Sequence, residues 1–113
     1  MKIYTLRMRA GDRDIFDAIR SGTKKVETRA ATVRNRMMKA GDEVIFSCGA
    51  QKLKKTIVKV SAYKTIKAML KDYRISEIAP GLKTESELRD MYFAWPAYRN
   101  KIKKFGLIVS ELK

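Results

Sequence analysis

The chain has 113 residues, with 26 lysines and arginines against 12 acidic residues, for a formal net charge of +14. A chain of this length forms one domain, so we expect residues 1–113 to be a single domain with a modest core. It has one cysteine and no histidine, which excludes an internal disulfide and any Ser-His or Cys-His nucleophile. We expect no metal site and no cofactor.

The apolar runs and the net charge indicate the cellular compartment of the protein and the kind of partner that it binds. No apolar run is long enough to span a membrane, and residues 1–7 lack the apolar core of a signal peptide. We therefore expect a cytoplasmic protein with no membrane partner. The positive charge favours a polyanion as partner, namely RNA or a nucleotide, with DNA as an alternative. The competing explanation is that the lysines only solubilise the surface, and the sequence indicates no oligomeric state.

The first predicted element is a strand over residues 2–9, whose alternation places Leu6 on an apolar face and Arg7 on the opposite face. A short helix follows, with Asp12 as its N-cap and Gly22 at its end. The apolar stripe of this helix consists of Ile15, Phe16 and Ile19. Each element thus has one face suited to a shared core.

A second strand is predicted over residues 25–29, and it carries opposed charges. Strand alternation places Val26 and Thr28 on one side, and Glu27 and Arg29 on the other. Glu27 and Arg29 are therefore close enough to interact with each other or with a common ligand.

The rest of the chain is predicted to combine strands with short helices. The expected elements are a basic loop or single helical turn over residues 30–40, strands over residues 43–47, 53–63 and 105–112, and a short helix over residues 65–70. Thr84 and Glu87 form a capping box that begins a further helix, which Pro96 ends. Four or five strands with inserted helices indicate an α+β fold, a small mixed β-barrel with short peripheral helices.

The order of motifs along nearly the whole chain resembles the ASCH domain family of the PUA-like superfamily. The motifs are Gly22-x-Lys24-x-x-Glu27-x-Arg29, Gly41-Asp42-x-Val44-Ile45-Phe46 and Phe105-Gly106-Leu107-Ile108-Val109. The resemblance implies a PUA-like β-barrel with a cleft beside the first helix and the loop that follows it. It also implies RNA binding or RNA-linked regulation, since the family is associated with both, and some members are enzymes.

One branch of the family gives the alternative of an enzyme. Its small bacterial members hydrolyse the acetyl group of N4-acetylcytidine with a lysine, a threonine three residues later and a distant glutamate. By position, Lys24 matches the lysine, Glu27 replaces the threonine, and Glu77 lies in roughly the region of the glutamate. The resemblance thus implies, as alternatives to plain binding, an N4-acetylcytidine amidohydrolase or a ribonuclease, with Lys24 and Glu27 as catalytic residues.

Within the expected cleft, three residues are candidates for binding a nucleotide or base. Glu27 would accept a hydrogen bond from a base amine, and Lys24 would hold a phosphate or an oxyanion. Arg29 would either hold Glu27 in place or grip a phosphate. The competing interpretation is an exposed ion pair between Lys24 and Glu27, which contributes ~0–1 kcal/mol.

Further candidates lie in other segments. Arg7 projects from the first strand toward the same region, Arg34, Arg36, Lys101 and Lys103 would supply phosphate attraction, and Tyr98 is a candidate for base stacking. Tyr98 stands among cations, a pattern typical of single-stranded nucleic-acid binding, although the ring could instead pack against Phe105. We expect the arginines of the 30–40 loop to be solvated and mobile, adding affinity without sequence preference.

Overall fold

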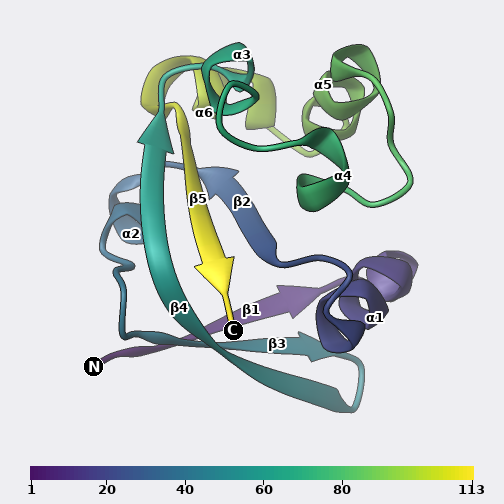
Figure 1. The fold of residues 1–113 in the computed structure, drawn as a ribbon, viewed down its shortest axis with the longest axis vertical. Helices are drawn as coiled ribbons and strands as arrows, with labels where there is room; N and C mark the ends of the chain where they lie inside the picture. Colours follow the sequence, from purple (N-terminus) through teal and green to yellow (C-terminus); the bar gives the residue numbers. More distant parts are fainter.

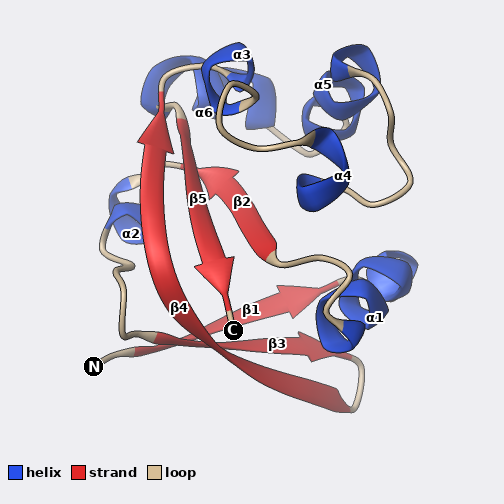
Figure 2. Ribbon diagram, in the orientation of Figure 1, coloured by secondary structure: helices blue, strands red, loops and turns tan.

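The computed structural model describes residues 1–113 as an α+β fold built on one curled sheet (Figure 1). The strands are β1 (Ile3–Met8), β2 (Val26–Ala30), β3 (Glu43–Cys48), β4 (Gln51–Tyr63) and β5 (Leu107–Leu112). They lie in the order β1-β3-β4-β5-β2, and only the β1–β3 pair is parallel. Figure 2 shows how the sheet curls into a half-barrel, so the predicted α+β fold with a small barrel-like sheet is confirmed.

Short helices surround the sheet. They are α1 (Arg13–Ser21), α2 (Val33–Arg36), α3 (Ile66–Met69), α4 (Ile75–Ile78), α5 (Glu85–Phe93) and α6 (Tyr98–Phe105), with one 3-10 turn, Ala10–Asp12, before α1. Helices α3 to α6 gather at one end of the sheet, and α1 lies toward the other end (Figure 1). None of these helices is both long enough and apolar enough to cross a membrane.

The longest strand, β4, belongs to both halves of the sheet. Its first part, up to Thr56, pairs with β3, and its second part, from Ile57 onward, pairs with β5. The register shifts between Ile57 and Lys59. An irregularity of this kind bends a strand and increases its twist, so β4 turns from one half of the sheet into the other.

The bend separates two clusters of buried side chains. One lies among β1, β3 and α1 and consists of Leu6, Phe16, Ile19, Met38, Val44, Phe46, Cys48 and Ile57. The other lies beneath α3 to α6 and consists of Val26, Ala30, Ile66, Met69, Tyr73, Ile78, Leu88, Tyr92, Ile102, Leu107 and Val109. Helix α1 belongs to the first cluster and β2 to the second, so the connection between them passes from one half to the other.

The first two predicted elements are confirmed. In β1, Leu6 is buried and Arg7 is exposed, as the alternation predicts. Helix α1 ends at Gly22, whose left-handed φ of 85° closes it. Asp12 occupies the N-cap position, but its side chain makes no capping hydrogen bond. The 3-10 turn is the reason, because it holds Asp12 at φ −97° and ψ 17° instead of the extended N-cap conformation.

Most later predictions also agree with the structure. The predicted strands correspond to β2, β3 and β4, the single helical turn to α2 and the short helix to α3. The capping box of Thr84 and Glu87 begins α5. Two helices, α4 and α6, were missed, and the closing strand begins at Leu107 because Phe105 still belongs to α6. Helix α4 is a single turn, and α6 buries only Ile102 among its lysines, so neither gives a periodic apolar pattern.

Gly106 makes the turn from α6 into β5 possible. Its φ is 77°, and a Cβ at this position would lie 2.3 Å from the carbonyl oxygen of Tyr63 in β4. The Gly106 carbonyl also accepts a hydrogen bond of 2.9 Å from the amide of Ala31. Only glycine allows β4, β5 and α6 to approach this closely.

We expect Gly106→Ala to lower the free energy of unfolding by more than about 2 kcal/mol, because the strain of a positive φ and a clash with backbone add together. Gly49→Ala is the matched control, since Gly49 has φ 60° but nothing within 4 Å of an added Cβ. Urea denaturation of both variants measures the difference. An equal loss in the two variants would show that the contact with Tyr63 has no energetic effect.

Asp42 is a buried carboxylate at the start of β3, only 1% exposed. Its Oδ1 accepts a hydrogen bond from the amide of Lys2 at 3.0 Å, and its Oδ2 accepts one from the amide of Lys39 at 3.1 Å. The Lys2 amide is the main cause that lowers the pKa of Asp42, and the Lys39 amide and ammonium contribute, against the opposing effect of burial. The Gly41-Asp42 motif therefore fastens the start of β1 to β3.

A lowered pKa stabilises the fold above the unfolded value of about 3.9, and this contribution is lost as the pH falls through the folded pKa. We expect Asp42→Asn to melt at a lower temperature than the wild type at neutral pH. The difference between the two melting temperatures should decrease as the pH falls. Thermal denaturation followed by circular dichroism at decreasing pH tests this. Asp14→Asn, which changes an exposed carboxylate, is the control. A difference in melting temperature between wild type and Asp42→Asn that does not change with pH would contradict the lowered pKa of Asp42.

Candidate functional site

A cavity of about 490 Å³ opens between α1 on one side and the α4–α6 layer on the other. This volume is ordinary for a small-molecule site. The residues that line it are Arg7, Met8, Arg9, Asp12, Asp14, Ile15, Ala18, Lys24, Glu27, Thr28, Arg29, Ile78, Ala79, Pro80, Leu82, Met91, Trp95, Pro96 and Tyr98. Both halves of the molecule contribute, so the site exists only because the bent sheet brings them together.

The two sides of the cavity differ in chemistry. The side formed by β1, the 3-10 turn and α1 carries the charged residues Arg7, Arg9, Asp12 and Asp14. The side formed by α4 to α6 is largely apolar and aromatic, with Ile78, Pro80, Leu82, Met91, Trp95 and Tyr98. A ligand that fits both sides has a flat or apolar part and a charged or polar part.

Lys24 lies at the cavity and is only 6% exposed, which is rare for a lysine. It follows the left-handed turn at Gly22, and its backbone amide donates to the carbonyl of Ala18 at 2.9 Å. Its Nζ donates a hydrogen bond to the carbonyl oxygen of Ile78, the last residue of α4. This bond joins the start of β2 to α4 at the edge of the cavity.

Burial lowers the pKa of the Lys24 amine, and the negative charge of Glu27 opposes that effect. A buried amine with a lowered pKa is partly neutral at a pH where exposed lysines are fully charged. Lys24 therefore loses its proton more readily than an exposed lysine, and the neutral amine is the form that can accept a proton.

Glu27 and Arg29 lie on the same face of β2, as the alternation predicts. Arg29 Nε donates to Glu27 Oε1 at 3.1 Å, and the side chains are 30% and 15% exposed. Oε2 of Glu27 receives no hydrogen bond from the protein. The ion pair considered between Lys24 and Glu27 is not formed within 4.0 Å: Glu27 pairs with Arg29, and the Lys24 amine donates to the Ile78 carbonyl instead. One carboxylate oxygen therefore remains open to a ligand.

Thr28 lies on the opposite face of β2 and is buried. Its hydroxyl forms a hydrogen bond with the hydroxyl of Tyr92 in α5. Burial raises the pKa of Tyr92, which keeps this phenol protonated. The pair fixes α5 against β2 and thereby positions the aromatic side of the cavity.

Trp95 and Tyr98 are the aromatic residues of that side, and the buried ring of Tyr92 packs behind them. Trp95 lies nearly perpendicular to Tyr92 and Tyr98, with centroids 5.5 and 4.9 Å away, and Tyr98 stacks on Tyr92 at 6.5 Å. The Tyr98 hydroxyl accepts a hydrogen bond of 3.4 Å from the Ala30 amide. The packing of Tyr98 against Phe105 considered from the sequence is not found, because Tyr98 begins α6 and Phe105 ends it.

The remaining predicted residues lie outside the cavity. Arg34, Lys101 and Lys103 are exposed. Arg36 is tied down, because its Nε donates to the Ala31 carbonyl at 2.7 Å and its Nη2 to the Phe105 carbonyl at 2.8 Å. The expectation of a mobile arginine in this loop is therefore wrong for Arg36, whose hydrogen bonds hold α2 against the end of α6.

Several features of the site were missed from the sequence. Strand alternation predicts that Arg9 shares the face of Arg7, but Arg9 was not chosen as a candidate site residue. The contribution of Ile78 is a backbone carbonyl, for which no sequence signal exists. Glu77 lies outside the cavity and is exposed, and its Oε1 accepts a hydrogen bond of 2.9 Å from the Arg74 amide. Nowhere do three or more acidic or cysteine side chains converge as a metal site would require.

Comparison with known proteins supports the fold. The chain is similar to hypothetical protein PH0355, whose crystal structure has a TM-score of 0.85 and 27% identity over 100% of this chain and 98% of that one. It has the same fold as protein PF0455 from Pyrococcus furiosus, whose solution NMR structure has a TM-score of 0.76 and 24% identity, covering 100% of this chain and 96% of that one. No protein-family model and no curated protein matches the chain.

Replacement of Lys24 by methionine tests the lowered pKa. Between the folded pKa and the unfolded value of about 10.4, the unfolded chain binds one more proton at this residue than the folded chain does. The free energy of unfolding of the wild type, relative to Lys24→Met, should therefore rise with pH across this window. Urea denaturation at a series of pH values measures it, with the exposed neighbour Lys25→Met as control. A flat or falling difference contradicts the assignment.

Proposed function

We propose that this chain is an ASCH-type domain of the PUA-like superfamily that binds RNA, and that its cavity holds one base or nucleotide. The order of the sequence motifs and the curled five-stranded sheet support the family assignment. The observation that carries the proposed function is the cavity itself. In it, polar groups that have free hydrogen-bonding capacity face a side made of aromatic and apolar residues.

A nucleobase matches both sides of this cavity. Its flat faces pack against apolar and aromatic side chains such as those of Met91 and Trp95. Its edge carries N–H donors and ring nitrogen or carbonyl acceptors. The open Oε2 of Glu27 would accept from an N–H group, and the Lys24 amine would donate to an acceptor.

The charged side suits the phosphate that accompanies the base. Arg7 and Arg9 lie on this side, form no ion pair with a carboxylate and are exposed. Arg29 uses Nε for Glu27, which leaves its terminal nitrogens for a phosphate oxygen. Single-stranded RNA offers unstacked bases that can enter such a cavity, whereas a duplex would have to flip one out.

A second candidate is a hydrolase that acts on N4-acetylcytidine or on RNA. The lowered pKa of Lys24 favours it, because a partly neutral amine can take a proton from water. Arg29 would then stabilise an oxyanion. Glu27 in place of the threonine and the position of Glu77 outside the cavity weigh against the amidohydrolase.

The test uses cytidine 5′-monophosphate and the protein's own fluorescence, because Trp95 is the only tryptophan and lines the cavity. We expect the nucleotide to change this fluorescence saturably. Glu27→Gln should weaken binding by about 10- to 100-fold, the loss expected when an oriented acceptor to a base is impaired. Glu43→Gln, which changes a carboxylate outside the cavity, should bind like the wild type.

No change in fluorescence with any of the four common ribonucleotides would contradict the proposal. Incubation with N4-acetylcytidine and with RNA, followed by product analysis, distinguishes the second candidate. Release of acetate or cleavage of RNA that disappears in Lys24→Met would establish a hydrolase.

A further inference from the structure

The end of the molecule that carries α3 and α6 has a second concentration of charge outside the cavity. We refer to it as the α3–α6 lysine surface, which consists of Lys64, Lys67, Lys71, Lys101, Lys103 and Lys104. All six side chains are exposed, and none lies within 4.0 Å of a carboxylate. The nearest acid in sequence, Asp72, accepts a hydrogen bond of 2.7 Å from the Tyr63 hydroxyl.

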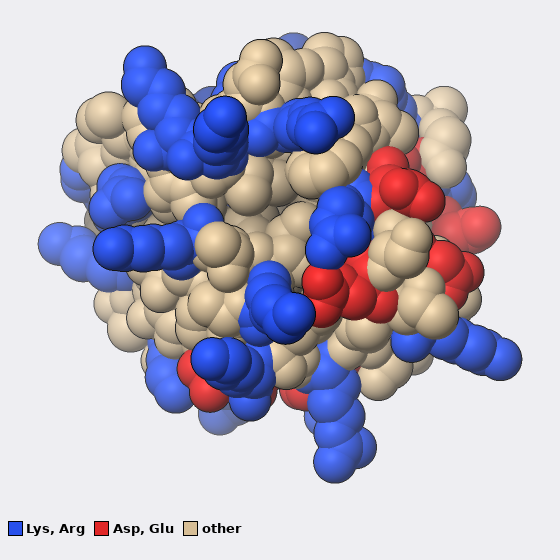
Figure 3. All heavy atoms as spheres, turned by 90° about the horizontal axis from the view of Figure 1, so that it is seen from above, with Lys and Arg blue, Asp and Glu red and all other residues tan.

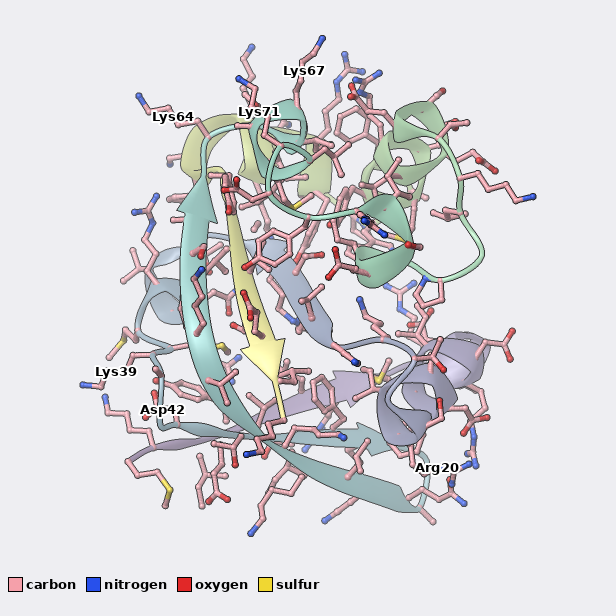
Figure 4. All side chains as sticks on the ribbon, in the orientation of Figure 1. Arg20, Lys39, Asp42, Lys64, Lys67 and Lys71 are labelled. Carbon is pink, nitrogen blue, oxygen red and sulfur yellow. The ribbon has the colours of Figure 1, made fainter.

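Tertiary structure brings the two groups of lysines together. The C-terminal end of α6 touches the end of β4, where a Cβ on Gly106 would lie 3.3 Å from Cα of Lys64. Figure 3 looks down on this end of the molecule, where many lysine and arginine side chains are exposed while carboxylates lie mostly toward the right of the view. Figure 4 shows Lys64, Lys67 and Lys71 pointing outward into solvent from this end.

Two ordinary explanations cover only part of this arrangement. Lys103 and Lys104 lie in the last turn of α6, where cations stabilise the helix dipole. Lysines also increase solubility, but acids interspersed among them would do so with less repulsion. Neither explanation accounts for so many exposed cations from two distant segments at one end of the molecule without an acidic partner.

The surface is continuous with the cavity. Tyr98, the first residue of α6, lines the cavity, and Nζ of Lys101 lies 5.8 Å from the centroid of its ring. From there α6 extends for eight residues, about 12 Å at the usual rise, and ends beside Lys64. The helix thus leads from the mouth of the cavity to the lysines around α3.

We propose that the α3–α6 lysine surface binds the sugar-phosphate backbone of the RNA strand whose base occupies the cavity. The proposal rests on the proposed function for the identity of the ligand. All six residues are lysines, which act as point charges without the planar fork of arginine. Such contacts add affinity that depends strongly on salt and is independent of base sequence.

The test compares three triple variants of the full chain. Lys64→Gln, Lys67→Gln and Lys71→Gln are combined in one, and Lys101→Gln, Lys103→Gln and Lys104→Gln in another. The matched control combines Lys52→Gln, Lys59→Gln and Lys113→Gln, which removes the same charge from exposed positions outside the surface. Each protein is titrated with a 12-nucleotide single-stranded RNA at several salt concentrations, and with cytidine 5′-monophosphate.

Each surface variant should bind the RNA about 10- to 100-fold more weakly near 0.1 M salt. The magnitude of the slope of log affinity against log salt should decrease by about 2, because each lost phosphate contact on a single strand removes ~0.7. Binding of cytidine 5′-monophosphate should not change in the variant of Lys64, Lys67 and Lys71, none of which lines the cavity. The control variant should keep the wild-type salt slope. Wild-type RNA affinity in both surface variants, or an equal loss in the control, would overturn the proposal. If RNA binding depends on these lysines while no nucleotide enters the cavity, the lysine surface is supported and the proposed function of the cavity fails.

Discussion

The bend in β4 is the constraint on which the rest of this structure depends. One thirteen-residue strand pairs with β3 over its first part and with β5 over its second, and its register shifts between Ile57 and Lys59. Because the sheet turns there, the buried side chains form two clusters instead of one. The cavity opens where the helices above the two clusters meet, so its floor and sides come from both halves. A flat sheet of the same strands would have no such hollow.

Lys24 is a charged residue type in a buried position, which is energetically unfavourable. Removing an amine from water costs free energy, which a hydrogen bond to the Ile78 carbonyl offsets only in part, and the pKa is lowered as a result. A hydrophobic residue of similar size would fill the same space without that cost. A buried lysine with a shifted pKa is typical of functional sites, where the shift is itself useful. The neighbouring pair of Glu27 and Arg29 keeps one carboxylate oxygen free beside it.

In the proposed function, the cavity and the α3–α6 lysine surface would divide recognition of RNA between them. The cavity combines directional polar groups with flat apolar side chains, an arrangement that would discriminate between bases. The lysine surface carries point charges, which would attract a polyanion of any sequence. Helix α6 joins them, because its first residue lines one and its later turns supply the other. Arg36 supports this helix from β2 and α2 by hydrogen bonds to Ala31 and Phe105.

The sequence alone determined the strands, the first helix and its end at Gly22, the capping box of α5, and the shared face of Glu27 and Arg29, because each depends on contacts or preferences within a few residues. It also placed Lys24, Glu27 and Arg29 in one short segment. Only the tertiary structure decided that Lys24 is buried against Ile78, that Arg36 is held by backbone carbonyls, and that Tyr98 packs on Tyr92 and Trp95. These contacts join residues far apart in the chain. They depend on the bend in β4 and on the close approach at Gly106, and neither feature produces a periodic pattern in the sequence.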